Sequence, residues 1–397
     1  MELDYKKYFL ELIAQTSPEP LLFEVERAEG LYLYDKNETA YIDLISGISV
    51  NNVGHRHPHI IEAIKKQLDR YLHTMVFGEH VQDIQVKLAK RILSHLPFEQ
   101  GAVYFVNSGS EAIEGALKLA KKATGRHEII AARNAYHGST HGALSLMSHT
   151  YYNQAFRPLL PGITFIDFNV EEEINAITEN TAAVVLETVQ GEAGYMPATS
   201  QFIHAIADKC KSTGTLLILD EVQCGFGRTG KFFAFQHYNI TPDIVVMAKG
   251  MGGGMPIGAF SAAKETMLHL SDNPILGHIT TFGGHPVSCA ASLATIEVIE
   301  EEQLMEQIES KEALFRRLLQ HAKINRITGK GLMLALHLDS FDQVKNIIQY
   351  CIQKRLITDW FLYATNCVRI SPPLTITESQ IIEVCTILIE ALEFELD

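Results

Sequence analysis

The chain has 397 residues, of which 47% are hydrophobic and 20% are charged, as in a globular protein with a substantial core. Its 33 Lys and Arg residues against 47 Asp and Glu residues give a formal net charge of −14, which argues against a protein that binds the phosphate backbone of nucleic acids. The six cysteines are scattered without CxxC spacing, so reduced thiols are expected in place of a disulfide framework or a zinc site.

The N-terminal stretch MELDYKKYFLELIAQTSPEP carries acidic residues from its start and has no uninterrupted apolar region, unlike a secretory signal peptide. No apolar run of the chain approaches the length of a membrane span. We therefore expect a cytoplasmic protein that does not bind membranes.

The predicted elements divide the chain into three parts. Residues 1–54 form an N-terminal segment, in which an amphipathic stretch is followed by short alternating strands. In residues 55–295, helical periodicity alternates with the apolar runs AVYFVNS, EIIAARN, ITFIDF, AAVVLET, TLLILDE and IVVMAKG, which is typical of a largely parallel sheet covered on both faces. Residues 296–397 combine helices with the strands GLMLALHL and VRISPPL into a smaller α+β domain, with which the N-terminal segment is expected to pack.

Polar side chains end several apolar runs of the α/β region. In open α/β sheets, ligands lie beyond the carboxyl ends of the strands, so these side chains are expected to meet at one rim. Their convergence is stronger evidence for a site than any one of them. The residues are Asn107, Ser108, Gly109, Ser110, Glu187, Asp220, Glu221 and Lys249.

Three of these features carry possible chemistry, and each has a simpler reading. The Ser-Gly-Ser turn in NSGSEAIEGALKLAKKA precedes a helix whose free N–H groups favour a phosphate, although Ser108 or Ser110 could act as a plain N-cap. Asp220 either caps a turn or holds a proton on a basic group. Lys249 follows the apolar run VVMA and precedes glycines, so it is either a snorkelling residue or a nucleophile whose pKa burial lowers, as in Schiff-base chemistry.

A rival motif, GFGRTGK at 225–231, matches the first seven positions of a Walker A loop. The next residue is Phe232, where Ser or Thr would bind magnesium, and the motif follows a helical-looking stretch instead of leaving a strand. Nucleotide hydrolysis is therefore disfavoured.

Several histidines have spacings that metal ligands can use, but no third ligand accompanies them in a recognisable pattern. Polar packing is the expected role, and we predict no metal site. These residues are His55, His57, His59, His137 and His141.

The motifs VNSGSEAIEGALKLA, AYHGST, ETVQGEAGY, LLILDEVQCGFGRTG, MAKGMGGGMPIGA, TTFGGHP and VRISPPL, in this order, resemble class III aminotransferases. These are pyridoxal-phosphate enzymes of fold type I, and the resemblance covers nearly the whole chain. It implies an α/β fold with a large domain, built on a mostly parallel seven-stranded sheet, and a smaller α+β domain. It also implies a homodimer with shared active sites.

The resemblance assigns the cofactor pyridoxal 5′-phosphate to particular positions. Lys249 matches the lysine that binds the cofactor covalently, and Asp220 matches the aspartate that keeps the pyridine nitrogen protonated. The other matching positions are Ser108, Gly109 and Ser110 for the phosphate, Tyr136 stacked on the ring, Val222 on its opposite face, Gln223 near the phenolic oxygen, and Thr281, which reaches the phosphate from the neighbouring subunit.

Substrate positions follow from the same resemblance. Arg369 matches the arginine that grips a substrate carboxylate, and Glu192 resembles the carboxylate that masks this arginine when an ω-amino donor is bound. The stretch around Ile48, SGISVNNVGH, resembles that of acetylornithine aminotransferases, whereas an aromatic residue is expected at this position in ornithine aminotransferases. Two departures stand out: Ser139 replaces the usual arginine that binds a substrate carboxylate, and Thr188 replaces the usual proline.

The resemblance implies a ping-pong transaminase in which Lys249 acts as general base and Asp220 stabilises charge. It moves an amino group from an ω-amino donor, with N-acetylornithine or a related ω-amino acid as the leading candidate, to 2-oxoglutarate. One alternative is another ω-amine or ω-amino acid aminotransferase, which uses pyruvate. A second is an aminomutase or racemase of the same fold, which needs no external keto acid.

Overall fold

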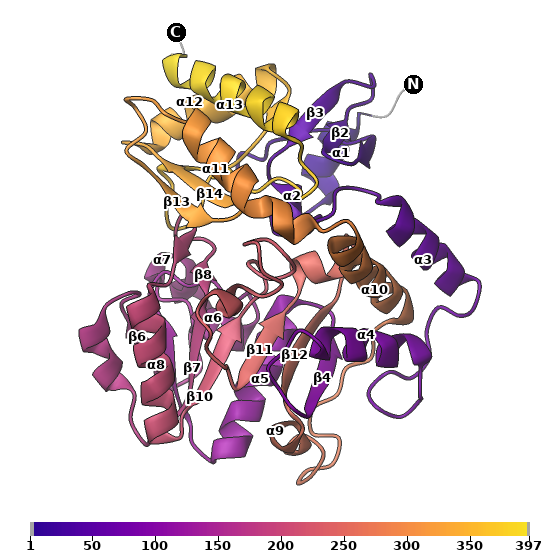
Figure 1. Cartoon of the computed structure of the whole chain (residues 1–397), viewed down its shortest axis with the longest axis vertical. Helices are drawn as coiled ribbons and strands as arrows, with labels where there is room; N and C mark the ends of the chain where they lie inside the picture. The colour runs from indigo at the N-terminus through magenta and orange to yellow at the C-terminus, as the bar shows by residue number, and fades with distance from the viewer. Residues whose placement is uncertain (1–3, 395–397) are drawn as a thin grey trace.

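The structure is a computed structural model that describes residues 4–394. Its centre is a seven-stranded sheet in the order β4-β12-β11-β10-β7-β5-β6, in which all pairs are parallel except those of β12, which runs antiparallel to both neighbours (Figure 1). This sheet confirms the predicted fold class. The strands are β4 (Gly101–Val106), β5 (Glu128–Ala132), β6 (Ile163–Ile166), β7 (Thr181–Glu187), β10 (Leu216–Asp220), β11 (Ile244–Met247) and β12 (Gly258–Ala263).

Strand β12 is the one member of this sheet that the apolar runs did not predict. Its sequence, GAFSAA, is poor in branched side chains. At its first residue a close backbone approach requires glycine, because a Cβ atom on Gly258 would collide with the carbonyl of Ser108.

Helices cover both faces of the large sheet. Successive side chains of a strand point to opposite faces, and both sets are apolar here, so each face needs a cover. Val185 and Ile218 pack in one hydrophobic cluster with Leu119 of α5. Their neighbours Val184 and Leu217 belong to another cluster, which includes Phe202 of α8. The longer helices of this region are α3 (Pro58–Leu68), α4 (Asp83–Leu93), α5 (Gly109–Thr124), α8 (Ser200–Thr213) and α10 (Pro286–Glu301).

Shorter elements connect the strands and helices of the large sheet. They are α6 (His141–Ser145), α7 (Thr150–Asn153), α9 (Lys264–Leu268), the hairpin of β8 (Val189–Gln190) and β9 (Met196–Pro197), and the 3-10 turns η1 (Gln154–Phe156), η2 (Glu171–Ala176), η3 (Ala234–His237) and η4 (Lys249–Gly252).

The C-terminal part of the chain contains a three-stranded antiparallel sheet in the order β13-β14-β16, which lies above the large sheet in Figure 1. Its elements are η5 (Leu304–Gln307), α11 (Ile308–Leu318), β13 (Arg326–Lys330), β14 (Met333–His337), α12 (Phe341–Gln353), β15 (Leu356–Ile357), β16 (Cys367–Ile370) and α13 (Glu378–Glu393).

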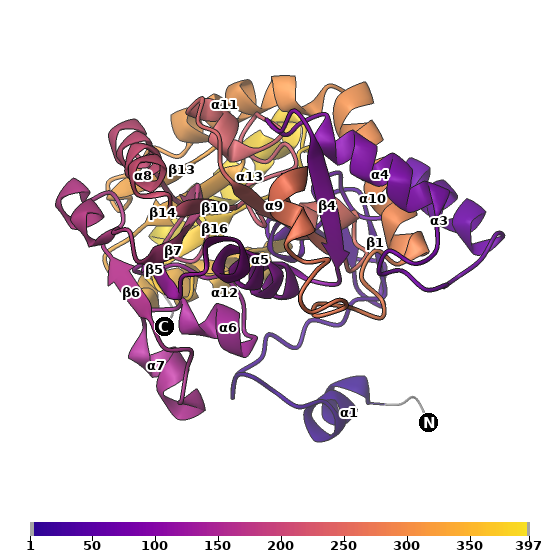
Figure 2. The ribbon, with the colours of Figure 1, turned by 90° about the horizontal axis from the view of Figure 1, so that it is seen from below.

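The N-terminal strands pair with the C-terminal part through a four-stranded sheet in the order β1-β2-β3-β15, in which β3 and β15 run parallel. Helix α1 buries no side chain and lies apart from the body of the chain in Figure 2. The remaining N-terminal elements are α1 (Tyr5–Leu12), β1 (Arg27–Glu29), β2 (Tyr32–Tyr34), β3 (Ala40–Asp43) and α2 (Ser46–Ser49).

The predicted division into 1–54, 55–295 and 296–397 stays a prediction. Its second boundary falls inside α10, and residues 1–3 and 395–397 of these ranges lie outside the described residues. Within the described chain, no helix combines the length and the apolar character that crossing a membrane requires.

Candidate active site

A cavity of about 430 Å³ lies at the carboxyl ends of β7, β10 and β11. It is lined by the predicted residues Ser108, Gly109, Ser110, Tyr136, Ser139, Asp220, Val222, Gln223 and Lys249. Four other predicted residues are not part of its wall, namely Ile48, Glu192, Thr281 and Arg369. The structure therefore brings together most of the positions that the motifs indicated, from four separate stretches of the chain.

Lys249 begins η4 two residues after β11 ends. Its φ of 47° lies in the left-handed region, which is costly for a residue with a side chain and occurs at functional sites. Burial lowers the pKa of the Lys249 amine, against the opposing charges of Glu192 and Asp220. The amine nitrogen donates a hydrogen bond to Oε1 of Gln223 at 3.4 Å. The neutral, nucleophilic form of this amine is thus favoured relative to that of a free lysine.

Asp220 is held by two hydrogen bonds at the end of β10. Its Oδ2 lies 2.7 Å from Nδ1 of the fully buried His137, and its Oδ1 accepts from the Val222 N–H at 2.9 Å. Burial opposes the charged ring, but the hydrogen bond to Asp220 raises the pKa of His137 above its ordinary value. The sequence had suggested only polar packing for His137, although its place in AYHGST beside Tyr136 was a usable signal.

Glu187, at the end of β7, is itself part of the cavity wall and holds the neighbouring backbone. Its carboxylate accepts hydrogen bonds from the backbone N–H groups of Tyr136 at 3.0 Å and Gly191 at 2.7 Å. Burial raises the pKa of Glu187 to about 7, although the charge of His137 opposes this rise. The Tyr136 hydroxyl in turn lies 3.2 Å from Oγ of Ser139. Glu187 thereby fixes the backbone that presents the Tyr136 ring.

The N-terminus of α5 forms a backbone-lined concavity in the cavity. Ser108 caps this 16-residue helix by accepting a hydrogen bond from the Glu111 N–H at 3.2 Å. A Cβ atom on Gly109 would lie 2.9 Å from Val222, and one on Gly138 would collide with Ser110. Glycine is therefore required at both positions, and the open helix end favours an anion such as phosphate.

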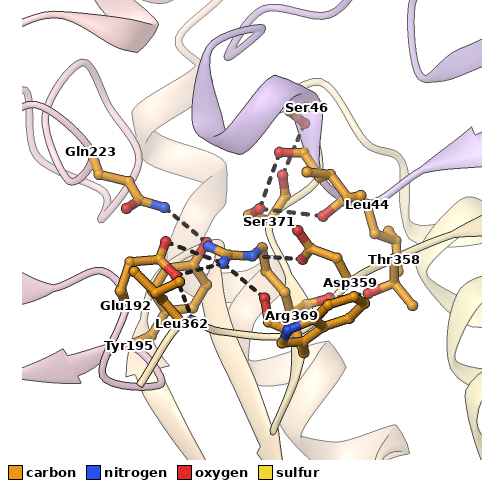
Figure 3. A network of polar contacts seen from close by, with 12 residues as sticks. Leu44, Ser46, Glu192, Tyr195, Gln223, Thr358, Asp359, Leu362, Arg369 and Ser371 are labelled. Carbon is orange, nitrogen blue, oxygen red and sulfur yellow. Dashed lines mark hydrogen bonds and ion pairs between the residues drawn. The ribbon is translucent and has the colours of Figure 1, made fainter. Parts of the chain in front are cut away.

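A chain of hydrogen bonds leads from the cavity to Arg369. Nε2 of Gln223 donates to the Tyr195 hydroxyl at 3.1 Å, and Nη1 of Arg369 donates to the same oxygen at 3.1 Å (Figure 3). Tyr195 is fully buried and has a φ of 49°. Since Gln223 also accepts from Lys249, three hydrogen bonds connect the lysine amine with the guanidinium.

Arg369 is only 2% exposed and lies between two carboxylates. Its Nη2 donates to Glu192 Oε2 at 3.1 Å and Oε1 at 3.2 Å, so the predicted neighbours are in contact. Its Nε donates to Asp359 Oδ1 at 2.7 Å, and its guanidinium carbon lies 4.3 Å from the centre of the Phe361 ring. The pKa of Arg369 is raised, because Tyr195 and both carboxylates outweigh burial. Asp359 belongs to none of the motifs of the sequence, so nothing local pointed to it.

The remaining predicted positions lie farther from the cavity. Ile48 is partly buried in α2 with a left-handed φ of 62°, and Val50 of the same segment lines the cavity. Thr281 is exposed in the connection between α9 and α10. Thr188 donates a hydrogen bond to Oε1 of the buried Glu221 at 2.7 Å, which a proline at that position could not do.

The Walker-like motif has a structural role in this fold. The fully buried Arg228 donates to the Asn52 side chain at 2.5 Å and to the carbonyl oxygens of Leu332 and Pro372, which ties three distant segments together. The motif forms turns and is followed by η3, not by a helix that could receive phosphate.

Four of the five histidines at metal-like spacings pair individually with carboxylates, and His141 lies 3.2 Å from the Phe156 carbonyl oxygen. His55 contacts Asp43 at 2.8 Å, and His59 contacts Glu297 at 2.8 Å. Within residues 4–394, no group of three or more His, Cys, Asp and Glu side chains is arranged to hold a metal ion.

The fold and the cavity define a class of enzyme, and the sequence comparisons agree with it. The family model described as Aminotransferase class-III matches residues 13–392, so the chain belongs to the class III aminotransferases. This confirms the predicted family and enzyme class.

Curated relatives are named acetylornithine aminotransferase. The protein of Caldanaerobacter subterraneus subsp. tengcongensis is 37% identical over 92% of this chain and 93% of its own length. The protein of Archaeoglobus fulgidus is 38% identical over 90% of this chain and 92% of its own length. The protein of Bacillus subtilis is 36% identical over 93% of this chain and 94% of its own length.

Solved structures share the whole fold. The ornithine aminotransferase from Toxoplasma gondii superposes with a TM-score of 0.90 at 27% identity, covering 98% of this chain and 94% of the other. A Bacillus anthracis aminotransferase gives a TM-score of 0.91 at 26% identity, covering 98% of both chains. Another structure of the Toxoplasma enzyme has PLP at partial occupancy in its active site.

Proposed function

We propose that this class III aminotransferase uses pyridoxal 5′-phosphate to move an amino group from an ω-amino donor, with N-acetylornithine or a related ω-amino acid as the best candidate, to 2-oxoglutarate. The observation that carries the proposal is the shared cavity of the Lys249 amine, the Asp220 carboxylate and the N-terminus of α5. The names of the curated relatives support the donor, and the PLP of the Toxoplasma structure supports the cofactor.

The residues of the cavity fit the cofactor. The concavity at Ser108, Gly109 and Ser110 would hold its phosphate, and Tyr136 and Val222 supply apolar wall for its ring. When bound, pyridoxal phosphate supplies an aldehyde that reacts with amines and a ring that accepts the electron pair released at the substrate carbon.

Two side chains of the cavity perform the central steps. Lys249, whose neutral form is favoured by burial, accepts a proton from the amine-bearing carbon of the donor and later returns one to the acceptor. Gln223 orients the amine through its Oε1. Asp220, held in place by His137, places negative charge where positive charge on the pyridine nitrogen must be stabilised.

Glu192 and Arg369 would distinguish the two substrates. While Glu192 occupies Nη2 of Arg369, the cavity receives an ω-amine without a carboxylate at this point. A 2-oxo acid, which carries a carboxylate beside its carbonyl, must take the place of Glu192 on the guanidinium. Ser139 supplies no second cation, so donors with a second carboxylate are bound less firmly than an arginine would allow.

We also propose that the protein forms a homodimer with shared active sites and that it is located in the cytoplasm. Apolar side chains are exposed in the connection that contains Thr281, among them Ile275, Leu276, Ile279 and Phe282. Such a concentration of exposed apolar residues is typical of a protein interface.

The test is a panel of amine donors assayed with 2-oxoglutarate, with pyruvate and without an acceptor. The proposal expects turnover of ω-amino donors with 2-oxoglutarate and none without an acceptor. Turnover with pyruvate alone would favour the other ω-aminotransferase, and turnover without a keto acid would indicate an aminomutase.

The Ser139→Arg variant tests the donor specificity in the same panel. It should lower the KM for donors that carry a second carboxylate, because it restores a cation at the cavity wall. Ser212→Arg, at an exposed position of α8, is the matched control. An unchanged donor preference in Ser139→Arg would mean that this position does not determine the donor.

A further inference from the structure

Arg369 binds two carboxylates, although Glu192 alone would be enough to occupy it until a substrate carboxylate arrives. In Figure 3 its guanidinium lies between Glu192 and Asp359, and both acids bind it directly. One cation between two carboxylates leaves a net formal charge of −1 at the place where a 2-oxo acid must bind its own carboxylate.

The two acids occupy different edges of the guanidinium. Asp359 binds Nε at 2.7 Å, whereas Glu192 binds Nη2 at 3.1 and 3.2 Å. Nη1 is bound by the Tyr195 hydroxyl at 3.1 Å. Nη2 also donates to the Trp360 carbonyl at 3.1 Å, so one of its two N–H groups becomes available to another carboxylate if Glu192 leaves, while Asp359 keeps its place on Nε.

The two acids also differ in how they are anchored. Asp359 is attached to the strand of Arg369, because the Arg369 N–H donates to the Asp359 carbonyl at 2.9 Å and the Thr358 hydroxyl donates to the Arg369 carbonyl at 2.5 Å. Glu192 comes from the β8–β9 hairpin beside the large sheet and is held through the Leu362 N–H at 2.9 Å. Asp359 therefore stays with the arginine, and Glu192 is the exchangeable partner.

We propose that Asp359 is a positioning and specificity-determining residue, which orients Arg369 through Nε and weakens its affinity for the carboxylate of the 2-oxo acid. This inference rests on the proposed function, because it concerns the same substrate pair. An incoming carboxylate meets an arginine whose charge is already balanced by Asp359, so it gains the hydrogen bonds of the guanidinium but only part of its Coulombic attraction. The amine donor, which is bound without a carboxylate on Arg369, does not experience this penalty.

Two variants separate the charge of Asp359 from its positioning effect. Asp359→Asn keeps an oxygen that can accept from Nε but removes the charge, so the KM for 2-oxoglutarate should fall roughly tenfold. Asp359→Ala also removes the acceptor, so the guanidinium is no longer held and the KM should rise. The KM for the amine donor should stay within about twofold in Asp359→Asn. A merely structural role would move both variants in the same direction.

Glu192 complicates this comparison, since removal of the Asp359 charge also strengthens its hold on Arg369. The Asn substitution is therefore repeated in a Glu192→Gln background, where the substrate no longer displaces a carboxylate. The fall in KM should be at least as large there. Asp342→Asn, an exposed aspartate of α12 that pairs with Lys345, is the matched control and should leave both KM values unchanged.

Binding of glutarate to the holoenzyme, measured by calorimetry, distinguishes failure of this inference from failure of the proposed function. Glutarate has no carbonyl and cannot react, so its Kd should fall in Asp359→Asn even if the donor and acceptor are misassigned. An unchanged or higher Kd and KM in Asp359→Asn, in both backgrounds, would overturn the inference. A fall of the same size in Asp342→Asn would also overturn it. If Asp359→Ala does not fold, the sign of the Asn effect alone decides.

Discussion

Asp220 and Arg369 are both buried charges, but their partners come from different places. Asp220 ends β10 and pairs with His137, which follows β5 of the same sheet. Arg369 lies on β16 of the small sheet and pairs with Glu192, which comes from a hairpin beside the large sheet. Under the proposed function, a charge paired within one sheet would be fixed and would suit a permanent cofactor. A charge paired across two sheets could exchange its partner and would suit a site that receives two substrates in turn.

The largest expected effect is that of Lys249→Ala, in the cavity that also contains Asp220. Loss of the amine should lower kcat/KM by at least about 10⁴-fold, because both covalent capture and proton transfer depend on it. The variant should also lose any cofactor that borohydride can fix to the chain. Lys264→Ala, at an exposed position that begins α9, is the control and should retain full activity. Full activity in Lys249→Ala would contradict the assignment of the nucleophile.

Asp220→Asn should reduce kcat/KM by about 10³-fold, since an amide of the same shape cannot balance positive charge in the cavity. The buried His137 would also lose its charged partner, so the unfolding free energy should fall by about 3 kcal/mol. Steady-state kinetics and urea unfolding measure the two effects. If activity fell no more than in an exposed Asp→Asn variant such as Asp342→Asn, the fixed pair would have no electrostatic role.

Glu192→Gln tests whether the partner of Arg369 can be exchanged. The amide removes one of the two negative charges on Arg369 and leaves that of Asp359, so donors with a carboxylate next to the amine should gain roughly tenfold in kcat/KM relative to ω-amines. The ratio of the two donor types with a common acceptor is the measurement. An unchanged ratio would mean that Glu192 does not decide between the substrates.

The smallest expected effect concerns the hydrogen bond between Thr188 and Glu221, the residue that follows Asp220. Glu221 is fully buried next to Asp220, and burial raises its pKa to about 7, although hydrogen bonds from Thr188 and two backbone N–H groups oppose this. Between its unfolded pKa and about 7 the folded state binds the extra proton, so stability falls as pH rises through this window. Thr188→Val removes one donor and should cost about 1 to 2 kcal/mol at pH 8.

The same substitution should cost less at pH 5.5, where the folded Glu221 is protonated and needs the hydroxyl less. Thr188→Ser keeps the hydroxyl and should restore most of the loss. Urea unfolding at the two pH values measures these differences. Equal costs at both pH values would indicate lost packing and not a hydrogen bond to a carboxylate.

The sequence predicted the large sheet wherever its strands are rich in branched residues. It missed β12, which has few branched residues and begins at Gly258, where the backbone of Ser108 comes close. It also predicted about half of the residues that line the cavity, because polar residues at the carboxyl ends of parallel strands must share one rim. The roles assigned to Ile48 and Thr281 stay predictions, since neither side chain lines the cavity in a single chain.

The sequence by itself determined the family, the fold class and the place of Lys249 and Asp220 at the shared rim, because these depend on local patterns of apolar runs and motifs. Only the tertiary structure decided which charges face each other. His137 meets Asp220 across 83 residues, and Thr188 meets Glu221 across 33. Asp359 is ten residues from Arg369, but the turn of the chain between them places it on Nε. Such pairings depend on where buried groups find partners in three dimensions, and a local pattern does not contain that information.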